Sequence, residues 1–126
     1  MENIVVLNVD DNSGARHAKT RLLLNAGFRV EEAADGATAL SMVGELVPAL
    51  VVLDVKLPDM SGHEVCRRIK AGAATSRVVV LQTSAALLSS LDSERGMDSG
   101  ADYYLAAPFE PKDLVNTVRA LLHAQR

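Results

Sequence analysis

The stretch LNVDDNSGARHAKTRLLL, residues 7–24, decides the fold. An apolar, strand-like run ends at two adjacent aspartates, Asp10 and Asp11, and a helix-like pattern begins directly after them. Two carboxylates held side by side repel each other, so the folded chain must gain something by keeping them at the end of a buried strand. A bound cation is the simplest such gain.

Strand-like and helix-like segments alternate along the rest of the chain. β-branched or continuously apolar runs predict strands at residues 3–9, 28–33, 49–55, 77–82 and 102–105. The run at 49–55 is apolar throughout, as is typical of a central parallel strand that is buried on both faces. Each parallel connection must cross over the sheet in the right-handed sense, so this alternation predicts a parallel α/β sheet with helices on both faces.

The helices between these strands are expected from their apolar spacing and their terminal residues. The apolar positions are Ala15, Ala18, Leu22 and Ala26 in the first helix, Ala37, Leu40, Val43 and Val47 in the second, Val65, Cys66 and Ile69 in the third, and Leu114, Val118, Leu121 and Leu122 in the last. Gly27 and Pro48 should end the first two helices, and Pro111 should begin the last. Segment 85–99 gives the weakest helical signal, because serines and Gly96 lower its helix propensity.

Composition sets limits on the class of protein. The 126 residues are enough for one domain, and we expect residues 1–126 to form a single one. A net charge of −3 and the absence of tryptophan argue against a nucleic-acid partner. No apolar run is long enough for a membrane span, and the opening residues do not resemble a signal peptide. Cys66 is the only cysteine, so we expect no disulfide and a reducing, cytoplasmic location.

A third carboxylate is expected beside Asp10 and Asp11. Asp54 lies near the end of the third predicted strand. In open α/β sheets, ligands bind beyond the carboxyl ends of the strands, where the strand order reverses. If the order is 2-1-3-4-5, the first and third strands are neighbours there, and the three acids converge. A hard, partly hydrated Mg²⁺ would then relieve their repulsion.

Four motifs together carry a family resemblance. They are VDDN at 9–12, LDVKLPDMSG at 53–62, SA at 84–85 and GADYYLAAPFEP at 100–111. In this order and spacing the chain resembles, over essentially its whole length, the receiver domain of two-component response regulators. The resemblance implies a flavodoxin-like (βα)5 doubly wound parallel sheet with strand order 2-1-3-4-5, the order of the chemotaxis receiver used as a standard example of this fold.

The resemblance also assigns roles at the acidic site. Asp54 would be the phosphoacceptor, taking a phosphoryl group from a phosphohistidine. Asp11 would be the main Mg²⁺ ligand, and Asp10 would support the site through ligand water or hydrogen bonds. The backbone carbonyl of Lys56 would complete the protein ligands, and Gly62, together with Pro58, would shape the loop.

Further roles fall on the fourth and fifth strands. Ser84 would supply the hydroxyl that binds a phosphoryl oxygen, with the small Ala85 leaving room for the phosphate. Thr83 remains an alternative for this hydroxyl. Tyr104 matches the aromatic residue that swings inward when the hydroxyl moves. Such a response is physically reasonable, because a new dianion can pull a nearby hydroxyl and bias a two-state element.

One position departs from the family pattern. Receivers usually carry a lysine directly before the proline of a KPF triplet, and this chain has Ala107 there. Alanine cannot pair with a phosphoryl group, so we expect altered coupling between the phosphate and the switch. Lys56, at the mouth of the expected pocket, could supply part of the missing charge, a hypothesis that rests only on its position.

The leading functional hypothesis is a phosphoacceptor in a bacterial His-to-Asp relay. Its partners would be a histidine kinase or phosphotransfer protein and a downstream target or attached output domain. The output would be reached through the face formed by segment 85–99, strand 102–105 and the last helix. The APFEP region is similar to receivers of hybrid sensor kinases, which favours that origin slightly.

Three other functions compete with this one. The first is a degenerate receiver that serves only as a docking module, suggested by Ala107. The second is a phosphohydrolase of the haloacid-dehalogenase type, but Lys56 stands where that motif needs a second aspartate. The third is a flavodoxin, whose phosphate loop would not carry the acidic DDNSGAR sequence.

Overall fold

The computed structural model describes residues 4–84 and 98–124. Within them the chain alternates between strands and helices. The elements are β1 (Val5–Val9), α1 (Ser13–Asn25), β2 (Arg29–Ala33), α2 (Gly36–Leu46), β3 (Leu50–Asp54), α3 (Gly62–Ala71), β4 (Val79–Ser84), β5 (Tyr103–Ala106) and α5 (Pro111–Ala124). None of the described helices is both long and apolar enough to cross a membrane.

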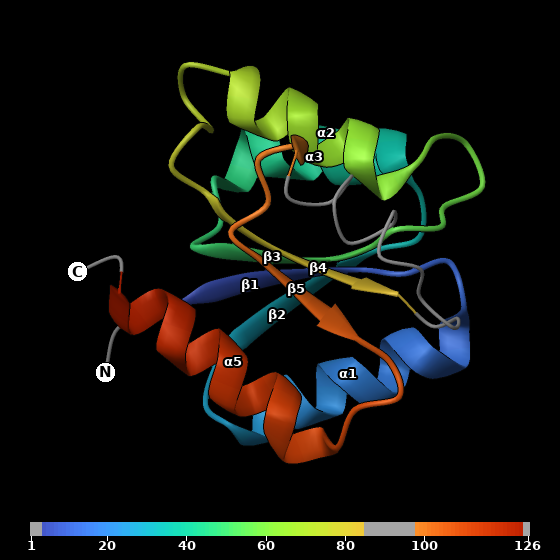
Figure 1. Ribbon diagram of the computed structural model, residues 1–126, viewed down its shortest axis with the longest axis vertical. Helices are drawn as coiled ribbons and strands as arrows, with labels where there is room; N and C mark the ends of the chain where they lie inside the picture. Colours follow the sequence, from blue (N-terminus) through green and yellow to red (C-terminus); the bar gives the residue numbers. More distant parts are fainter. Residues whose placement is uncertain (1–3, 85–97, 125–126) are drawn as a thin grey trace.

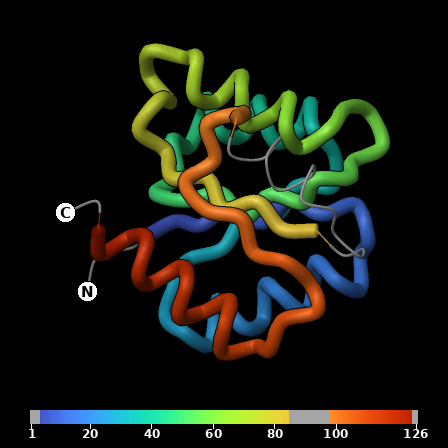
Figure 2. The backbone as a smooth tube through the Cα atoms, viewed as in Figure 1, coloured from blue at the N-terminus to red at the C-terminus, as the bar shows by residue number. Residues whose placement is uncertain are grey.

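The strands form one parallel sheet in the order β2-β1-β3-β4-β5. This confirms the predicted α/β class and strand order. Helices α2 and α3 cover one face of the sheet, and α1 and α5 cover the other (Figure 1). The tube in Figure 2 shows that β1 and β3 lie side by side at the centre although about forty residues separate them in sequence. The reversal of strand order between β1 and β3 therefore places their carboxyl ends next to each other.

Each face of the sheet has its own apolar core, because side chains alternate along a strand. Leu7, Val51 and Leu53 point toward α2 and α3, where they pack with Val43 and Ile69. The intervening positions of the same strands point toward α1 and α5. That second cluster consists of Val6, Leu23, Leu50, Val52, Val79, Leu81, Leu114 and Val118. Asp54 is two residues beyond Val52, so its side chain belongs to the α1 and α5 face.

Most helix boundaries follow from the local sequence. Side chains of Asn12, Asp35 and Ser61 cap α1, α2 and α3 by accepting a hydrogen bond from a backbone N–H three residues ahead. Gly27 follows the end of α1 with φ of 100°, which confirms its expected role as a terminator. The expected apolar positions of α3 and α5 also face the core.

The structure corrects three details of the sequence-based expectations. Strand β4 runs over Val79–Ser84 rather than 77–82, and β5 over Tyr103–Ala106 rather than 102–105. On α1 the buried residues are Lys19 and Leu23, whereas Ala15 and Ala18 are exposed. The buried stripe is therefore rotated from the expected one, and it includes a lysine that pairs with the buried Asp10 carboxylate. The helix expected at 85–99 lies almost entirely outside the described residues.

Candidate functional site

Three carboxylates meet at the carboxyl ends of β1 and β3. The register pairs Val9 with Leu53, so Asp10 and Asp54 follow side by side on neighbouring strands. One carboxylate oxygen from each of Asp10, Asp11 and Asp54 lies within 4.8 Å of the others. Asp10 and Asp54 are buried, and Asp11 is exposed. The structure thus brings together the three acids that the sequence predicted to converge.

Asp10 is held by two contacts that use different oxygens. Its Oδ1 accepts a hydrogen bond from the backbone N–H of Asn12 at 2.9 Å, and its Oδ2 lies 2.9 Å from the Lys19 ammonium nitrogen. The cap of α1 is Asn12 and not either aspartate. The acidic pair is therefore not explained by helix capping, and a second reason for the two charges is needed.

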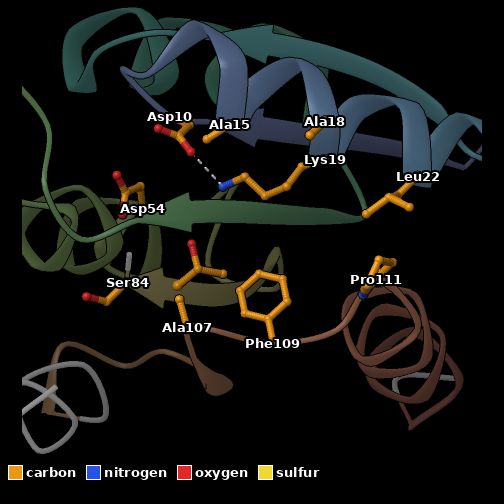
Figure 3. A pocket seen from close by; sticks show the side chains of 11 residues that line it. Asp10, Ala15, Ala18, Lys19, Leu22, Asp54, Ser84, Ala107, Phe109 and Pro111 are labelled. Atoms are coloured by element: carbon orange, nitrogen blue, oxygen red, sulfur yellow. Dashed lines mark ion pairs between the residues drawn. The ribbon is translucent and has the colours of Figure 1, made fainter. Parts of the chain in front are cut away.

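Lys19 lies at the acidic site, and the sequence analysis did not single it out. It is 8% exposed, on the buried side of α1, where an unpaired ammonium would be costly. In Figure 3 its side chain extends from α1 toward the ends of β1 and β3, and the dashed line marks its ion pair with Asp10. The only available signal was its position: Lys19 lies one turn before Leu23, the other buried residue of α1.

The α1 helix is fixed on the sheet by a polar network beside Lys19. The buried Asn8 side chain donates to the Arg16 carbonyl at 2.8 Å and to the Thr20 hydroxyl at 3.0 Å. Arg16 donates to the Asp10 carbonyl at 2.8 Å and pairs with Glu32 on β2 at 3.1 Å. These contacts on both sides of position 19 set the height and rotation of the helix, and so the place of the lysine.

Electrostatics at Asp54 favour a cation. Burial raises the pKa of Asp54 from its ordinary value of 3.8 to about 6, and the negative charges of Asp10 and Asp11 act in the same direction. The charge of Lys19 and a hydrogen bond from the Lys56 backbone N–H oppose this rise. The pKa of Asp54 stays raised in spite of Lys19, so one lysine does not compensate for burial and for the charges of the neighbouring carboxylates.

The loop after β3 is tied closely to the site. A Cβ added to Gly62 would lie 2.2 Å from the Asp54 carbonyl oxygen, so only glycine lets α3 begin this close to the strand. Asp59 accepts hydrogen bonds from the backbone N–H groups of Gly36 and Ala37 at 2.8 and 2.9 Å, which anchors the loop to the start of α2. Lys56 is exposed, and its backbone pairs with Ser61 in this loop.

A cavity of about 260 Å³ opens beside the carboxylates, between α1 and the segment that joins β5 to α5 (Figure 3). Its polar end holds Asp10, Lys19 and Asp54, with Thr83 and Ser84 on β4. Its remaining wall is small or apolar and consists of Ala15, Ala18, Leu22, Ala107, Phe109 and Pro111. Ala107, at the position where the resemblance leads one to expect a lysine, therefore presents only a methyl group to the cavity.

The two candidate hydroxyls both lie at this cavity. Thr83 is paired with Asp54 across the β3–β4 register and is 3% exposed. Ser84 is the last residue of β4 and is half-buried. The choice between them is thus left open by position alone.

Tyr104 lies on β5 near these hydroxyls but does not line the cavity. It is half-buried, and its hydroxyl oxygen is shielded from solvent. It pairs with Gln82 in the register, while Leu105 packs on the α1 and α5 side. Tyr104 and Ser84 are consequently on the same face of two neighbouring strands, two residues apart along the register.

The donor set suits a hard divalent cation. Three carboxylate oxygens within 4.8 Å of one another offer the all-oxygen surroundings that Mg²⁺ prefers. Burial, and after it the charge of Asp10, raises the pKa of Asp54, and a bound cation would favour its ionised form. The exposure of Asp11 leaves room for the water ligands that Mg²⁺ usually keeps.

Comparison with known proteins places this arrangement in a family. The family model described as the response regulator receiver domain matches residues 6–119. The chain belongs to this family. Receiver domains of this family generally bind Mg²⁺ at an acidic pocket and work with histidine kinases or phosphotransfer proteins in two-component signal transduction.

Individual relatives agree with this assignment. The DNA-binding response regulator MtrA of Mycolicibacterium paratuberculosis is 40% identical over 117 residues, which cover 93% of this chain and 50% of MtrA. A putative response regulator from Chloroflexus aurantiacus superimposes with a TM-score of 0.92 at 32% identity, covering 97% of this chain and 99% of that one. The signal receiver domain of a histidine kinase from Syntrophus aciditrophicus has a TM-score of 0.88 at 25% identity, covering 95% and 90%. The receiver spans about half the length of the curated relatives that it matches.

Proposed function

We propose that this receiver is a working phosphoacceptor, with Asp54 as the residue that carries the phosphoryl group. The main support is that one carboxylate oxygen from each of Asp10, Asp11 and Asp54 lies within 4.8 Å of the others. Asp54 is also the last residue of a fully buried strand. A rigid strand end fixes the nucleophile, and phosphoryl transfer needs positioning and charge neutralisation more than covalent help from the protein.

The reaction is a transfer between two side chains. A carboxylate oxygen of Asp54 attacks the phosphorus of a phosphohistidine on the partner, and a P–O bond forms while the P–N bond breaks. The imidazole nitrogen keeps the electron pair of the broken bond and takes up a proton. The product is an acyl phosphate on Asp54, which water later hydrolyses.

Asp10, Asp11, Asp54 and the Lys56 backbone carbonyl are the residues that would hold Mg²⁺. A bound divalent ion supplies Lewis-acid stabilisation of charge on the phosphoryl oxygens. Gly62 supports this assignment, because its lack of a side chain keeps the loop with Lys56 against the end of β3. Asp59 supports it as well, by anchoring the same loop to α2.

The proposed switch uses one hydroxyl on β4 and the aromatic ring of β5. We assign the hydroxyl to Ser84, with Thr83 as the alternative, and the ring to Tyr104. The shared face of Ser84 and Tyr104 on adjacent strands supports a direct mechanical link between them. The output surface would combine β5, α5 and segment 85–97, of which the last lies outside the described residues.

A second candidate function is a docking module that works without phosphate. Ala107 favours it, because the cavity wall is apolar where a charged side chain would stabilise a phosphoryl group. The intact acidic cluster argues against it, since three converging carboxylates cost folding free energy that a docking surface does not require.

The partners and setting follow from this proposal. A histidine kinase or phosphotransfer protein would donate the phosphoryl group in the cytoplasm. The receiver could be joined to an output domain, as the length of MtrA suggests, or to a kinase, as the Syntrophus aciditrophicus protein suggests. The absence of a nucleic-acid partner stays a prediction for these 126 residues, because MtrA is itself DNA-binding.

The test is phosphorylation by a small-molecule donor. The protein is incubated with acetyl phosphate and MgCl₂, and intact mass spectrometry measures the fraction that gains one phosphoryl group. We expect a phosphorylated species that is absent with EDTA and absent in Asp54→Asn. An unmodified wild-type protein, with a known receiver phosphorylated in parallel, would contradict the proposal and favour the docking module.

A further inference from the structure

The cavity beside Asp54 is lined by a basic side chain from α1. Among the described residues that line it, Lys19 is the only lysine or arginine. Arg16, on the same helix, is already engaged with the Asp10 carbonyl and Glu32. Lys56 is exposed and does not line the cavity. Within the described part of the chain, the positive charge inside this space therefore comes from Lys19 on α1.

Lys19 is buried at a place where only a charged partner justifies it. Its side chain is 10% exposed, and its ammonium nitrogen lies 2.9 Å from Asp10 Oδ2, which is equally shielded. Removing a lysine and a carboxylate from water is costly, and a pair of this kind contributes little to stability compared with apolar residues of the same size. A helix that faced the core with leucine at position 19 would be simpler, so a role in the site explains the lysine better.

Small side chains line the cavity that Lys19 shares with Asp54. Its neighbours on the cavity side are the small Ala15 and Ala18 of the same helix and Ala107 across the cavity. A lysine side chain has four rotatable bonds and three donor hydrogens. A phosphoryl group on Asp54 would enter the cavity that Asp54 and Lys19 share. Rotation of the Lys19 side chain would bring its ammonium group to the phosphoryl oxygens.

Resting on the proposed function, we propose that Lys19 is the phosphoryl-binding cation of this receiver, supplied from α1 in place of the lysine that position 107 lacks. In the resting protein its ammonium group pairs with Asp10. After phosphorylation it donates to a phosphoryl oxygen on Asp54. The positive charge at the phosphoryl site would then come from Lys19 on α1 and not from position 107, which lies after β5 on the opposite wall of the cavity.

The same geometry bears on the small residue at position 107. A lysine at position 107 would project into the space that Lys19 would cross, and two ammonium groups would then compete for one dianion. The small residues at 15, 18 and 107 are thus consistent with a cavity that accommodates one cation arriving from α1.

The test measures binding of beryllofluoride, which mimics a phosphoryl group on a carboxylate, at saturating Mg²⁺. Because the chain has no tryptophan, the readout is isothermal titration calorimetry. The variants are Lys19→Met, Lys19→Arg and the double variant Lys19→Met/Ala107→Lys. Lys112→Met is the matched control, since it removes one exposed lysine outside the cavity. Circular dichroism melting verifies that each variant is folded at the assay temperature.

We expect Lys19→Met to weaken beryllofluoride binding about tenfold or more, the usual effect of losing a hydrogen bond between charged groups. Its Mg²⁺ affinity should stay equal or rise, because a competing cation has gone. Lys19→Arg should retain most of the binding, and the double variant should regain it. Lys112→Met should match the wild type.

Two results overturn the inference separately from the proposed function. If Lys19→Met binds beryllofluoride as tightly as the wild type, while Asp54→Asn does not bind it, the receiver works but Lys19 only neutralises Asp10. If Lys19→Met binds beryllofluoride more weakly but Ala107→Lys does not restore the binding, the inference that Lys19 takes the place of a lysine at position 107 is wrong. If the wild type itself binds neither beryllofluoride nor phosphate, both the proposed function and the role of Lys19 fail.

Discussion

The two faces of the sheet use the same strands for different purposes. Toward α2 and α3, the strands present Leu7, Val51 and Leu53 to a continuous apolar cluster. Toward α1 and α5, the same strands carry Asn8 in β1 and Asp54 at the end of β3, and a cavity of about 260 Å³ interrupts the packing. Both faces contribute an apolar core, but only the α1 and α5 face also gives room at its carboxyl end to the buried charged groups of the site.

The α2 and α3 face should give the largest loss of stability and no loss of chemistry. Ile69 on α3 is 1% exposed, and Ile69→Ala should lower the free energy of unfolding by about 2–5 kcal/mol because it leaves a cavity in a closed core. Urea denaturation measures the change. Leu24→Ala, at a site that is 50% exposed on α1, should change stability by less than about 0.5 kcal/mol.

A folded Ile69→Ala protein should still take up phosphate on Asp54 at the wild-type rate. Loss of phosphorylation in the folded fraction would mean that the two faces are not as independent as the comparison implies.

At Asp54 a substitution should stabilise the protein. The folded state binds the Asp54 proton more tightly than the unfolded chain, since the pKa rises from 3.8 to about 6, so ionising Asp54 destabilises the metal-free fold. This cost is absent below the unfolded pKa and complete above the folded one. Asp54→Asn should therefore be more stable than the wild type by about 1–3 kcal/mol at about pH 8, and by almost nothing at about pH 3.

The measurement is urea denaturation of both proteins across this pH range in EDTA. Saturating Mg²⁺ at about pH 8 should reduce the difference, because only the wild type has the full set of carboxylates to bind it. Equal stabilities at every pH would show that the fold does not raise the pKa of Asp54 by burial and neighbouring charge.

The polar network under α1 should have a smaller effect. Asn8→Ala removes the donors to the Arg16 carbonyl and the Thr20 hydroxyl from a position that is 0% exposed, and should cost about 1–2 kcal/mol. Because this network positions α1, it should also weaken beryllofluoride binding, measured by calorimetry. A variant with lower stability and unchanged binding would separate the position of Lys19 from the network.

The smallest effect is expected from a charged contact at the amino end of β5, away from the acidic site at the carboxyl ends of the strands. Asp102 accepts hydrogen bonds from Lys70 on α3 and from the Val80 backbone N–H, each at 2.8 Å, and both side chains are partly exposed. Asp102→Asn should cost about 1 kcal/mol or less in urea denaturation. Phosphorylation of the folded protein should be unchanged, because these charges fasten β5 and do not face the acidic site.

Sequence patterns predicted the parts of the site that depend on strand order. The apolar runs that end at Asp10 and Asp54 predicted two buried parallel strands. The strand order that the family resemblance implied made them neighbours, and the acids had to converge once that order was known. The cap was within reach of the same reasoning, because Asn12 directly precedes α1 and asparagine is a favoured capping residue.

The parts that escaped prediction depend on contacts between distant residues. Lys19 reads as a solvent-facing lysine in a helical pattern, and only the position of Asp10 on the sheet makes its burial tolerable. Asp59 reads as an ordinary loop aspartate, and only the approach of α2 turns it into an anchor. Strand β4 begins two residues later than expected because the Val78 backbone N–H donates to the Thr75 carbonyl in the preceding turn, and pairing with β3 starts at Val79.

The central claim is that Asp10, Asp11 and Asp54 form one cation site, and a Mg²⁺ titration tests it most directly. Calorimetry at about pH 8, above the raised pKa of Asp54, should show one Mg²⁺ bound per chain in the wild type. Binding should be strongly weakened in Asp11→Asn, which removes a carboxylate that is exposed and makes no structural contact with Lys19. An absence of binding by the wild type at millimolar Mg²⁺, or equal binding by the two proteins, would contradict the account.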